Sequence, residues 1–173
     1  MLNKGSVVEP LPFQFFNHYF WAIAIGISLI NYVIGRRRIV AAIGLSHGQP
    51  SDMLGLFGRL CLFSNMPWLV MGWGLLYGGV PSVFSYLQPQ DHNPYVSCWY
   101  GSLLLLAIVN ALWILLADGA GKVRELQQLG AFGSRQKSAA TPAWTIKLLA
   151  ILGPVFVLIW IYWMQFVTVQ APH

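Results

Sequence analysis

Four long stretches of the sequence carry no Asp, Glu, Lys or Arg, and they limit what the chain can fold into. They contain 26, 31, 26 and 26 residues, at positions 10–35, 60–90, 92–117 and 148–173. A bilayer core about 30 Å thick needs roughly 20 apolar residues in a helix, because the helix rises about 1.5 Å per residue. Each stretch is therefore long enough for one membrane crossing and too short for two.

The overall composition agrees with a membrane location. Hydrophobic residues make up 57% of the 173 residues and charged residues only 9%, and the mean hydropathy is +0.60. A soluble protein with four such segments would have too little polar surface to cover them, which argues against a disordered chain, a nucleic-acid module or an ordinary soluble enzyme. We predict an all-α, polytopic integral membrane protein with a single domain over residues 1–173.

Four transmembrane helices are expected, at about 15–35, 60–80, 97–117 and 148–169. Transmembrane strands would alternate apolar and polar residues, which the run 103–109 (LLLLAIV) does not do. A cleaved signal peptide is the alternative for the first helix, but its basic residues Arg36, Arg37 and Arg38 follow the apolar stretch instead of preceding it. We expect this helix to be retained.

The basic residues predict the orientation. Nine of the ten Lys and Arg residues lie in the loops 36–59 and 118–147. The positive-inside rule places both loops in the cytoplasm or its equivalent, which gives an N-out/C-out bundle with both termini on the non-cytoplasmic side. The membrane is then a bacterial inner membrane or an equivalent such as the thylakoid. The net charge of +5 is therefore explained by the orientation of the chain in the membrane. It gives no reason to expect nucleic acid as a partner.

Small and polar residues inside the spans predict close helix packing. Gly74 and Gly78 form a G-x-x-x-G pattern whose partner helix, internal or in another protein, the sequence leaves open. Asn110 is the deepest neutral polar residue, and we expect it to face the bundle interior. Pro67 and Pro154 are expected to kink the second and fourth helices.

The boundaries of the two basic loops carry further predictions. The second helix is expected to start at the capping sequence 50–52, before the membrane. The third is expected to continue past Asp118 through 122–129 as an amphipathic stretch. Arg59 and Asp118 both lie at the inner boundary, and we expect them to form an ion pair.

Active-site chemistry is not evident in the sequence. The predicted spans contain no Asp, Glu, Lys or Arg, which argues against a self-contained ion-coupled transporter. Cys61 and Cys98 are expected near opposite ends of the bilayer, too far apart for a disulfide, and His18 and His92 make too thin a ligand set for a metal. We therefore predict no catalytic residues and no metal site, and the cofactor remains unknown.

The loop 81–94 allows two interpretations. Its prolines and aromatic residues are compatible with a fixed cap on the non-cytoplasmic face, where a ligand or partner binds. The alternative, which we favour at this point, is a short interfacial connection.

The leading hypothesis for function is a non-catalytic small membrane subunit that acts as an accessory, scaffold or assembly factor of a larger complex. Its expected partners are the lipid bilayer and either other integral membrane subunits or further copies of itself. The alternative is a binding protein for an amphipathic cofactor or lipid, such as a quinone, haem or pigment, in a pocket near the kinks at Pro67 and Pro154. A small membrane enzyme or transporter is the third hypothesis.

Overall fold

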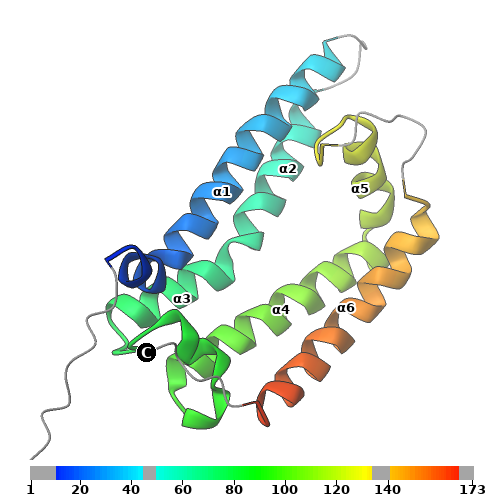
Figure 1. Ribbon diagram of the computed structural model, residues 1–173. Helices are drawn as coiled ribbons and strands as arrows, with labels where there is room; N and C mark the ends of the chain where they lie inside the picture. The colour runs from blue at the N-terminus through cyan, green and yellow to red at the C-terminus, as the bar shows by residue number, and fades with distance from the viewer. Residues whose placement is uncertain (1–10, 45–49, 134–140, 168–173) are drawn as a thin grey trace, which may run out of the picture.

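A computed structural model of the protein describes residues 11–44, 50–133 and 141–167, and within these ranges the chain is helical with no strand (Figure 1). The elements in chain order are α1 (Leu11–Ile43), α2 (Pro50–Ser64), α3 (Met66–Leu76), η1 (Val83–Leu87), η2 (Pro89–Asp91), α4 (Pro94–Leu116), α5 (Gly119–Gln128) and α6 (Ala143–Met164). The two η elements are short 3-10 helices. The all-α prediction is confirmed for the described residues.

Four helical segments are long and apolar enough to cross a membrane. They are Phe15–Ile43, Asp52–Leu76, Pro94–Leu116 and Ala143–Met164. Large apolar side chains on their surfaces are exposed, for example Ile30 at 61% and Phe156 at 63%. Such side chains are stable when they contact lipid, so the structure supports the predicted multi-pass membrane protein.

The helix bounds differ from the predicted ones in an instructive way. The first span was expected to end at residue 35, but α1 continues to Ile43 and includes Arg36–Arg38. The basic residues do not stop the helix, because no helix breaker follows them before Gly44. The second span begins at Pro50, as the capping sequence predicts, and α6 begins and ends five residues earlier than expected.

The predicted continuation of the third helix past Asp118 is wrong. Asp118 has a left-handed backbone with φ of 53°, so α4 ends at Leu116 and α5 starts in a new direction at Gly119. The amphipathic character of the following stretch is confirmed, because Leu126 on α5 is fully buried. In Figure 1, α5 stands at the end of the α4–α6 pair and turns back toward α1 and α2.

The second span is broken at Asn65, between α2 and α3. Pro67 has no N–H to continue the hydrogen-bond ladder, and side chains take over part of it. The carbonyl of Cys61 accepts from Ser64 Oγ at 2.8 Å and from Asn65 Nδ2 at 2.6 Å. Asn65 Nδ2 also donates to Ser28 Oγ on α1 at 2.7 Å. Side chains at the break therefore satisfy the Cys61 carbonyl, as the membrane requires of backbone groups outside a regular helix.

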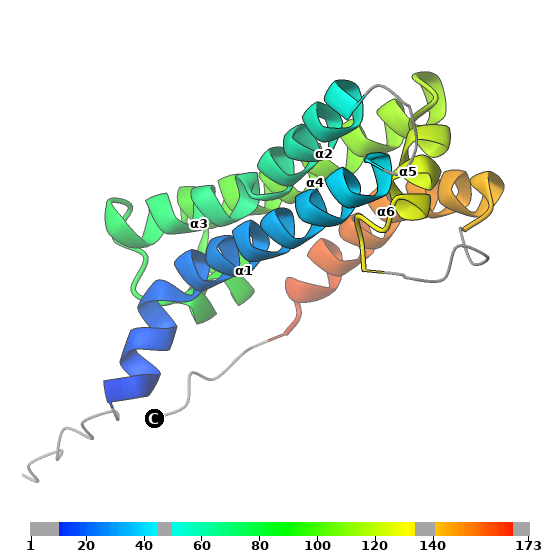
Figure 2. The same ribbon diagram turned by 90° about the horizontal axis from the view of Figure 1, so that it is seen from above.

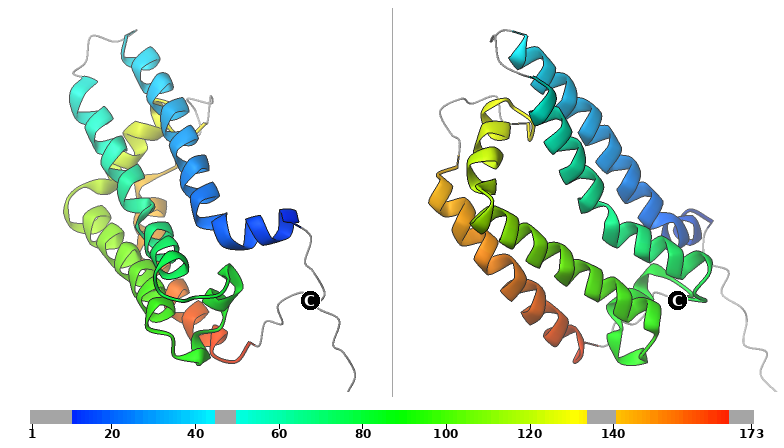
Figure 3. Two further views of the ribbon diagram at one scale, coloured as in Figure 1. Left: turned by 90° about the vertical axis from the view of Figure 1, so that its left-hand side faces the viewer. Right: turned by 180° about the vertical axis from the view of Figure 1, so that it is seen from behind.

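The spans form two helical pairs that meet at one end. One pair is α1 with α2 and α3, and the other is α4 with α6; α3 packs against α4. The pairs diverge toward the end that carries Arg36, Arg37 and Arg38, which we call the basic end, and meet at the opposite end, which we call the aromatic end (Figures 1 and 3). Figure 2 shows α1 alongside α2 and α3 from above. The fold therefore resembles an open V with α5 near its mouth (Figure 1).

A cluster rich in aromatic side chains joins the two pairs at the aromatic end. Its buried members are Met71, Leu75, Val80, Tyr86, Val96, Trp99 and Tyr100. The Tyr86 hydroxyl donates to the Met71 carbonyl at 2.9 Å, and the Tyr100 hydroxyl donates to the Tyr86 carbonyl at 2.8 Å. Trp99 packs edge-on against Tyr86, with ring centroids 5.4 Å apart. These contacts couple α3, η1 and α4 into one unit.

The segment that carries η1 and η2 is a fixed cap and not a simple connection. The Val83 amide donates to Asn17 Oδ1 on α1 at 3.2 Å. Gln90 Nε2 donates to the carbonyl of Val167, beyond the end of α6, at 3.3 Å. With Tyr86 fully buried, this short segment contacts α1, α3 and α4 and the residue Val167 that follows α6, which favours a fixed cap over the simple connection expected from sequence.

A smaller cluster closes the basic end. It consists of Ile39, Phe57, Leu126 and Ala131 and brings α1 and α2 against α5 and the turn that follows it. Reciprocal hydrogen bonds between Gln127 and Thr141 tie the end of α5 to the start of α6, at 3.1 and 3.4 Å. The V is therefore bridged at its mouth, and space remains between its arms.

The buried hydroxyl of Tyr86 gives a testable pH dependence. Burial raises the pKa of Tyr86 to about 12, above the value near 10 of an exposed tyrosine. Its contribution to stability is fully present below about pH 10 and is lost as the pH rises toward 12. We expect Tyr86→Phe to lower the melting temperature near neutral pH. The difference in melting temperature between this variant and the wild type should become smaller at about pH 11. Thermal unfolding in mild detergent measures both, and a gap independent of pH would contradict the assignment.

Candidate ligand-binding cavity

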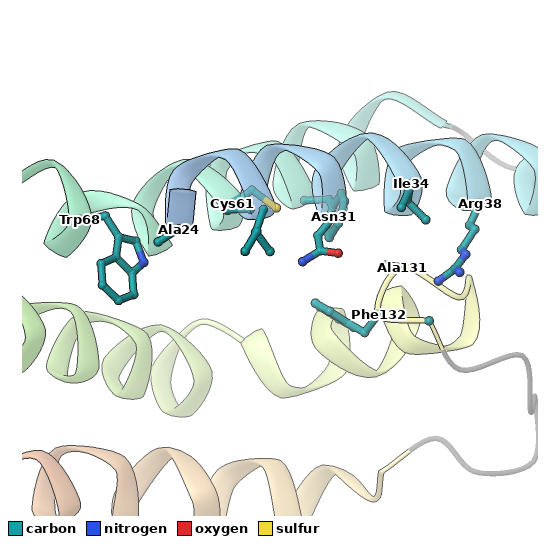
Figure 4. A pocket seen from close by; sticks show the side chains of 12 residues that line it. Ala24, Asn31, Ile34, Arg38, Cys61, Trp68, Ala131 and Phe132 are labelled. Atoms are coloured by element: carbon teal, nitrogen blue, oxygen red, sulfur yellow. The ribbon is translucent and has the colours of Figure 1, made fainter. Parts of the chain in front are cut away.

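One cavity is lined by α1, α2, α3 and the turn after α5, and none of its lining residues belongs to α4 or α6. It has a volume of about 690 Å³, within the range of about 300–1,000 Å³ typical of small-molecule sites. α1 forms one wall from Ala24 to Arg38, α2 and α3 add Cys61 and Trp68, and Phe132 from the turn after α5 closes the basic end. Figure 4 shows Asn31, Arg38 and Trp68 pointing from the helices into this space.

The walls of the cavity change character along its length. Ala24, Ile27 and Trp68 make the part nearer the aromatic end apolar, whereas Asn31 and then Arg38 lie toward the basic end. From residue 24 to residue 38 a helix rises about 21 Å. The cavity thus matches an elongated molecule with an apolar tail and a polar head.

Arg38 reaches across the mouth of the cavity. A side chain at Gly133 would approach its Nη1 atom to 3.1 Å, so the guanidinium lies against the turn that follows α5. Arg38 is exposed and lines the cavity. A guanidinium in this position suits a carboxylate, phosphate or carbonyl oxygen on a ligand head.

The break at Asn65 separates this cavity from a smaller one on the other side of α1 and α2. The smaller cavity has a volume of about 370 Å³, and Ser28 and Cys61 line both cavities. Asn65 lines only the smaller one and is 8% exposed. Because Asn65 bonds to Ser28, the helix break shapes the wall between the two spaces.

The structure places the two packing glycines at the aromatic end, away from the cavity. A side chain at Gly74 would collide with the Tyr86 hydroxyl and come within 3.1 Å of Tyr95 Cβ. One at Gly78 would come within 2.5 Å of the Tyr95 ring. This face of α3 is therefore occupied by η1 and α4 of the same chain.

Asn110 and the two residues expected to pair lie on the opposite side of α2. Asn110 is partly buried and lines a third cavity together with Arg59. Arg59 Nε donates to the Gly55 carbonyl of its own helix at 3.3 Å, and the Asp118 carboxylate lies against Gly121. The structure shows no ion pair between Arg59 and Asp118 among the residues that it describes.

Sequence reasoning did not single out most of the cavity residues. Ser28 and Asn31 are visible in the sequence as neutral polar residues within a span, but nothing there distinguishes them from ordinary interhelical contacts. Pro67 was the useful signal, because the break beside it lies next to the cavity. Pro154 lies inside α6 and is not among the residues that line the cavity.

The cavity lining offers groups that could bind a ligand through hydrogen bonds and one positive charge. Its lining provides an amide, a hydroxyl, a thiol and a guanidinium, and no carboxylate or imidazole. Within the described ranges, no three His, Cys, Asp or Glu side chains gather in a group that could hold a metal ion. The arrangement suits the binding of an amphipathic molecule.

No protein-family model matches this sequence, and no curated protein or solved structure gives a match.

Proposed function

We propose that this membrane protein binds a long amphipathic molecule in the cavity formed by α1, α2, α3 and the turn after α5. The observation that carries the proposal is the cavity itself, which has an apolar body beside Ile27 and Trp68 and a guanidinium at its mouth. The ligand class is an acyl-chain or isoprenoid amphiphile whose head bears a carboxylate, phosphate or carbonyl group. Lipids and quinones fit this description, and the absence of histidine from the lining makes haem a poorer match.

The proposal is tested by what the purified protein carries. The full chain is isolated in mild detergent, washed until bulk phospholipid is removed, and extracted with organic solvent for mass spectrometry. We expect one ligand class in an amount close to one molecule per chain, since the proposed site is a single cavity of about 690 Å³. A preparation that retains no molecule after washing would overturn the proposal.

A role as an accessory subunit of a larger complex stays a prediction. The G-x-x-x-G pattern of Gly74 and Gly78 contributed to it, but Tyr86 and Tyr95 of the same chain occupy that face. The pattern therefore no longer argues for a second protein. Mass spectrometry of copurifying chains tests the subunit role separately from the ligand.

The orientation is also part of the proposal. The basic end carries Arg36–Arg38 and Arg59, and the positive-inside rule places it on the cytoplasmic side of a bacterial inner membrane or its equivalent. We expect alkaline phosphatase fused after His173 to be active, and the same enzyme inserted after Gly133 to be inactive. An inactive fusion at His173 together with an active one at Gly133 would reverse the orientation.

A further inference from the structure

A groove between α2 and α4 at the basic end has a composition unlike that of the cavity described above. It has a volume of about 300 Å³ and includes two cations from different elements, Arg59 of α2 and Lys122 of α5. Asn110 of α4 adds a neutral hydrogen-bonding group. The remaining lining is apolar, with Leu60, Phe63 and Leu106 among the contributors.

We infer that this groove binds the headgroup of an anionic phospholipid from the membrane leaflet at the basic end. Basic pockets between transmembrane helices at the membrane surface are suited to such headgroups. In this groove the cations meet the phosphate, and the apolar residues contact the first part of an acyl chain. The site is distinct from the proposed ligand cavity, because the two share no lining residue.

The two cations are accessible to a headgroup. Both side chains are exposed, and the bond from Arg59 Nε to Gly55 uses only one edge of the guanidinium. No acidic side chain lines the groove among the described residues; the Asp118 carboxylate lies against Gly121 on α5. The lining itself therefore carries two positive charges and no negative one, and a zwitterionic lipid gains less from it than an anionic one.

The apolar lining selects a lipid over a free phosphate. Phe63 is 50% exposed and continues the groove along α2 toward the middle of the membrane. A water-soluble phosphate would leave this apolar surface without a partner, whereas an acyl chain covers it. The headgroup matches the basic part of the lining, and the acyl chain matches its apolar part.

Native mass spectrometry of the full chain in mild detergent tests the inference. The probes are phosphatidylglycerol, phosphatidylcholine with the same acyl chains, and glycerol 3-phosphate. We expect phosphatidylglycerol to bind about tenfold more tightly than phosphatidylcholine, because both cations face one headgroup. Arg59→Gln/Lys122→Gln should remove this preference, and Arg59→Lys/Lys122→Arg should retain it.

The control removes equal charge from the same end of the molecule. Arg37→Gln/Arg124→Gln changes one residue of α1 and one of α5, both exposed and outside the groove, and should keep the preference. Equal binding of the two lipids by wild type, or equal loss in both glutamine double variants, would overturn the inference. Binding of glycerol 3-phosphate as tight as that of phosphatidylglycerol would also overturn it. If Arg59→Gln/Lys122→Gln fails to fold, Lys122→Gln alone is the substitute, because this exposed side chain can be changed without disturbing the fold. It should still weaken the preference for phosphatidylglycerol over phosphatidylcholine.

Discussion

Gly74→Ala is expected to destabilise the protein by about 2–4 kcal/mol, because it combines overpacking with the displacement of a buried hydrogen bond. A methyl group at this position would collide with the Tyr86 hydroxyl, which donates to the Met71 carbonyl. Tyr86 is fully buried at the junction of the two helical pairs. Displacement of the Tyr86 side chain should weaken the packing of the whole aromatic end. The melting temperature in mild detergent measures this destabilisation.

The matched control for this prediction is Gly101→Ala in α4. An added Cβ at Gly101 has no heavy atom within 4 Å, so alanine should be neutral or slightly stabilising there. A double-mutant cycle with Tyr86→Phe tests the mechanism, because removal of the hydroxyl should relieve part of the cost of Gly74→Ala. Similar melting temperatures for Gly74→Ala and Gly101→Ala would contradict the packing of η1 against α3.

Ile27→Trp is expected to lower ligand occupancy about tenfold or more, which corresponds to about 1.4 kcal/mol or more of binding free energy. Ile27 lines the apolar part of the cavity, and an indole there takes up space that the ligand tail would occupy. The readout is the amount of ligand retained per chain after detergent washing. The melting temperature of the same preparation shows whether the fold is intact.

Val33→Trp is the control for this substitution. Val33 lies on another face of the same helix, is 46% exposed, and is not among the residues that line the cavity. Its indole should face lipid, where tryptophan is tolerated, and ligand occupancy should equal that of wild type. Equal loss of ligand in both variants would show that the effect does not arise in the cavity.

The spans could be predicted from the sequence because lipid imposes a simple rule. A charged side chain in the hydrocarbon is costly, so four charge-free stretches correspond to four apolar helices. The break at Asp118 could not be predicted in the same way. Its left-handed conformation accompanies close packing of Gly119 against Trp113 and Ile114, a contact across the turn that the pattern of apolar residues does not reveal.

The candidate site was less accessible to sequence reasoning. The cavity forms where α1, α2 and α3 meet the turn after α5, which are segments far apart in the sequence. The insertion of Tyr86 beside Gly74 is likewise a contact between separate elements. Tyr86 belongs to a short 3-10 segment, which carries no helical periodicity that would reveal its partner. The G-x-x-x-G pattern identified the small face correctly but not the side chains that cover it.

Photo-crosslinking in the intact membrane tests the central claim most directly. A benzophenone amino acid is placed at Ile27 in the cavity lining or at Val33 on another face of α1, and the mass added to the protein is measured after illumination. We predict one defined adduct at position 27 and a mixture that reflects the bulk phospholipids at position 33. The same phospholipid mixture at both positions would show that the cavity holds ordinary membrane lipid, and would contradict a specific ligand site.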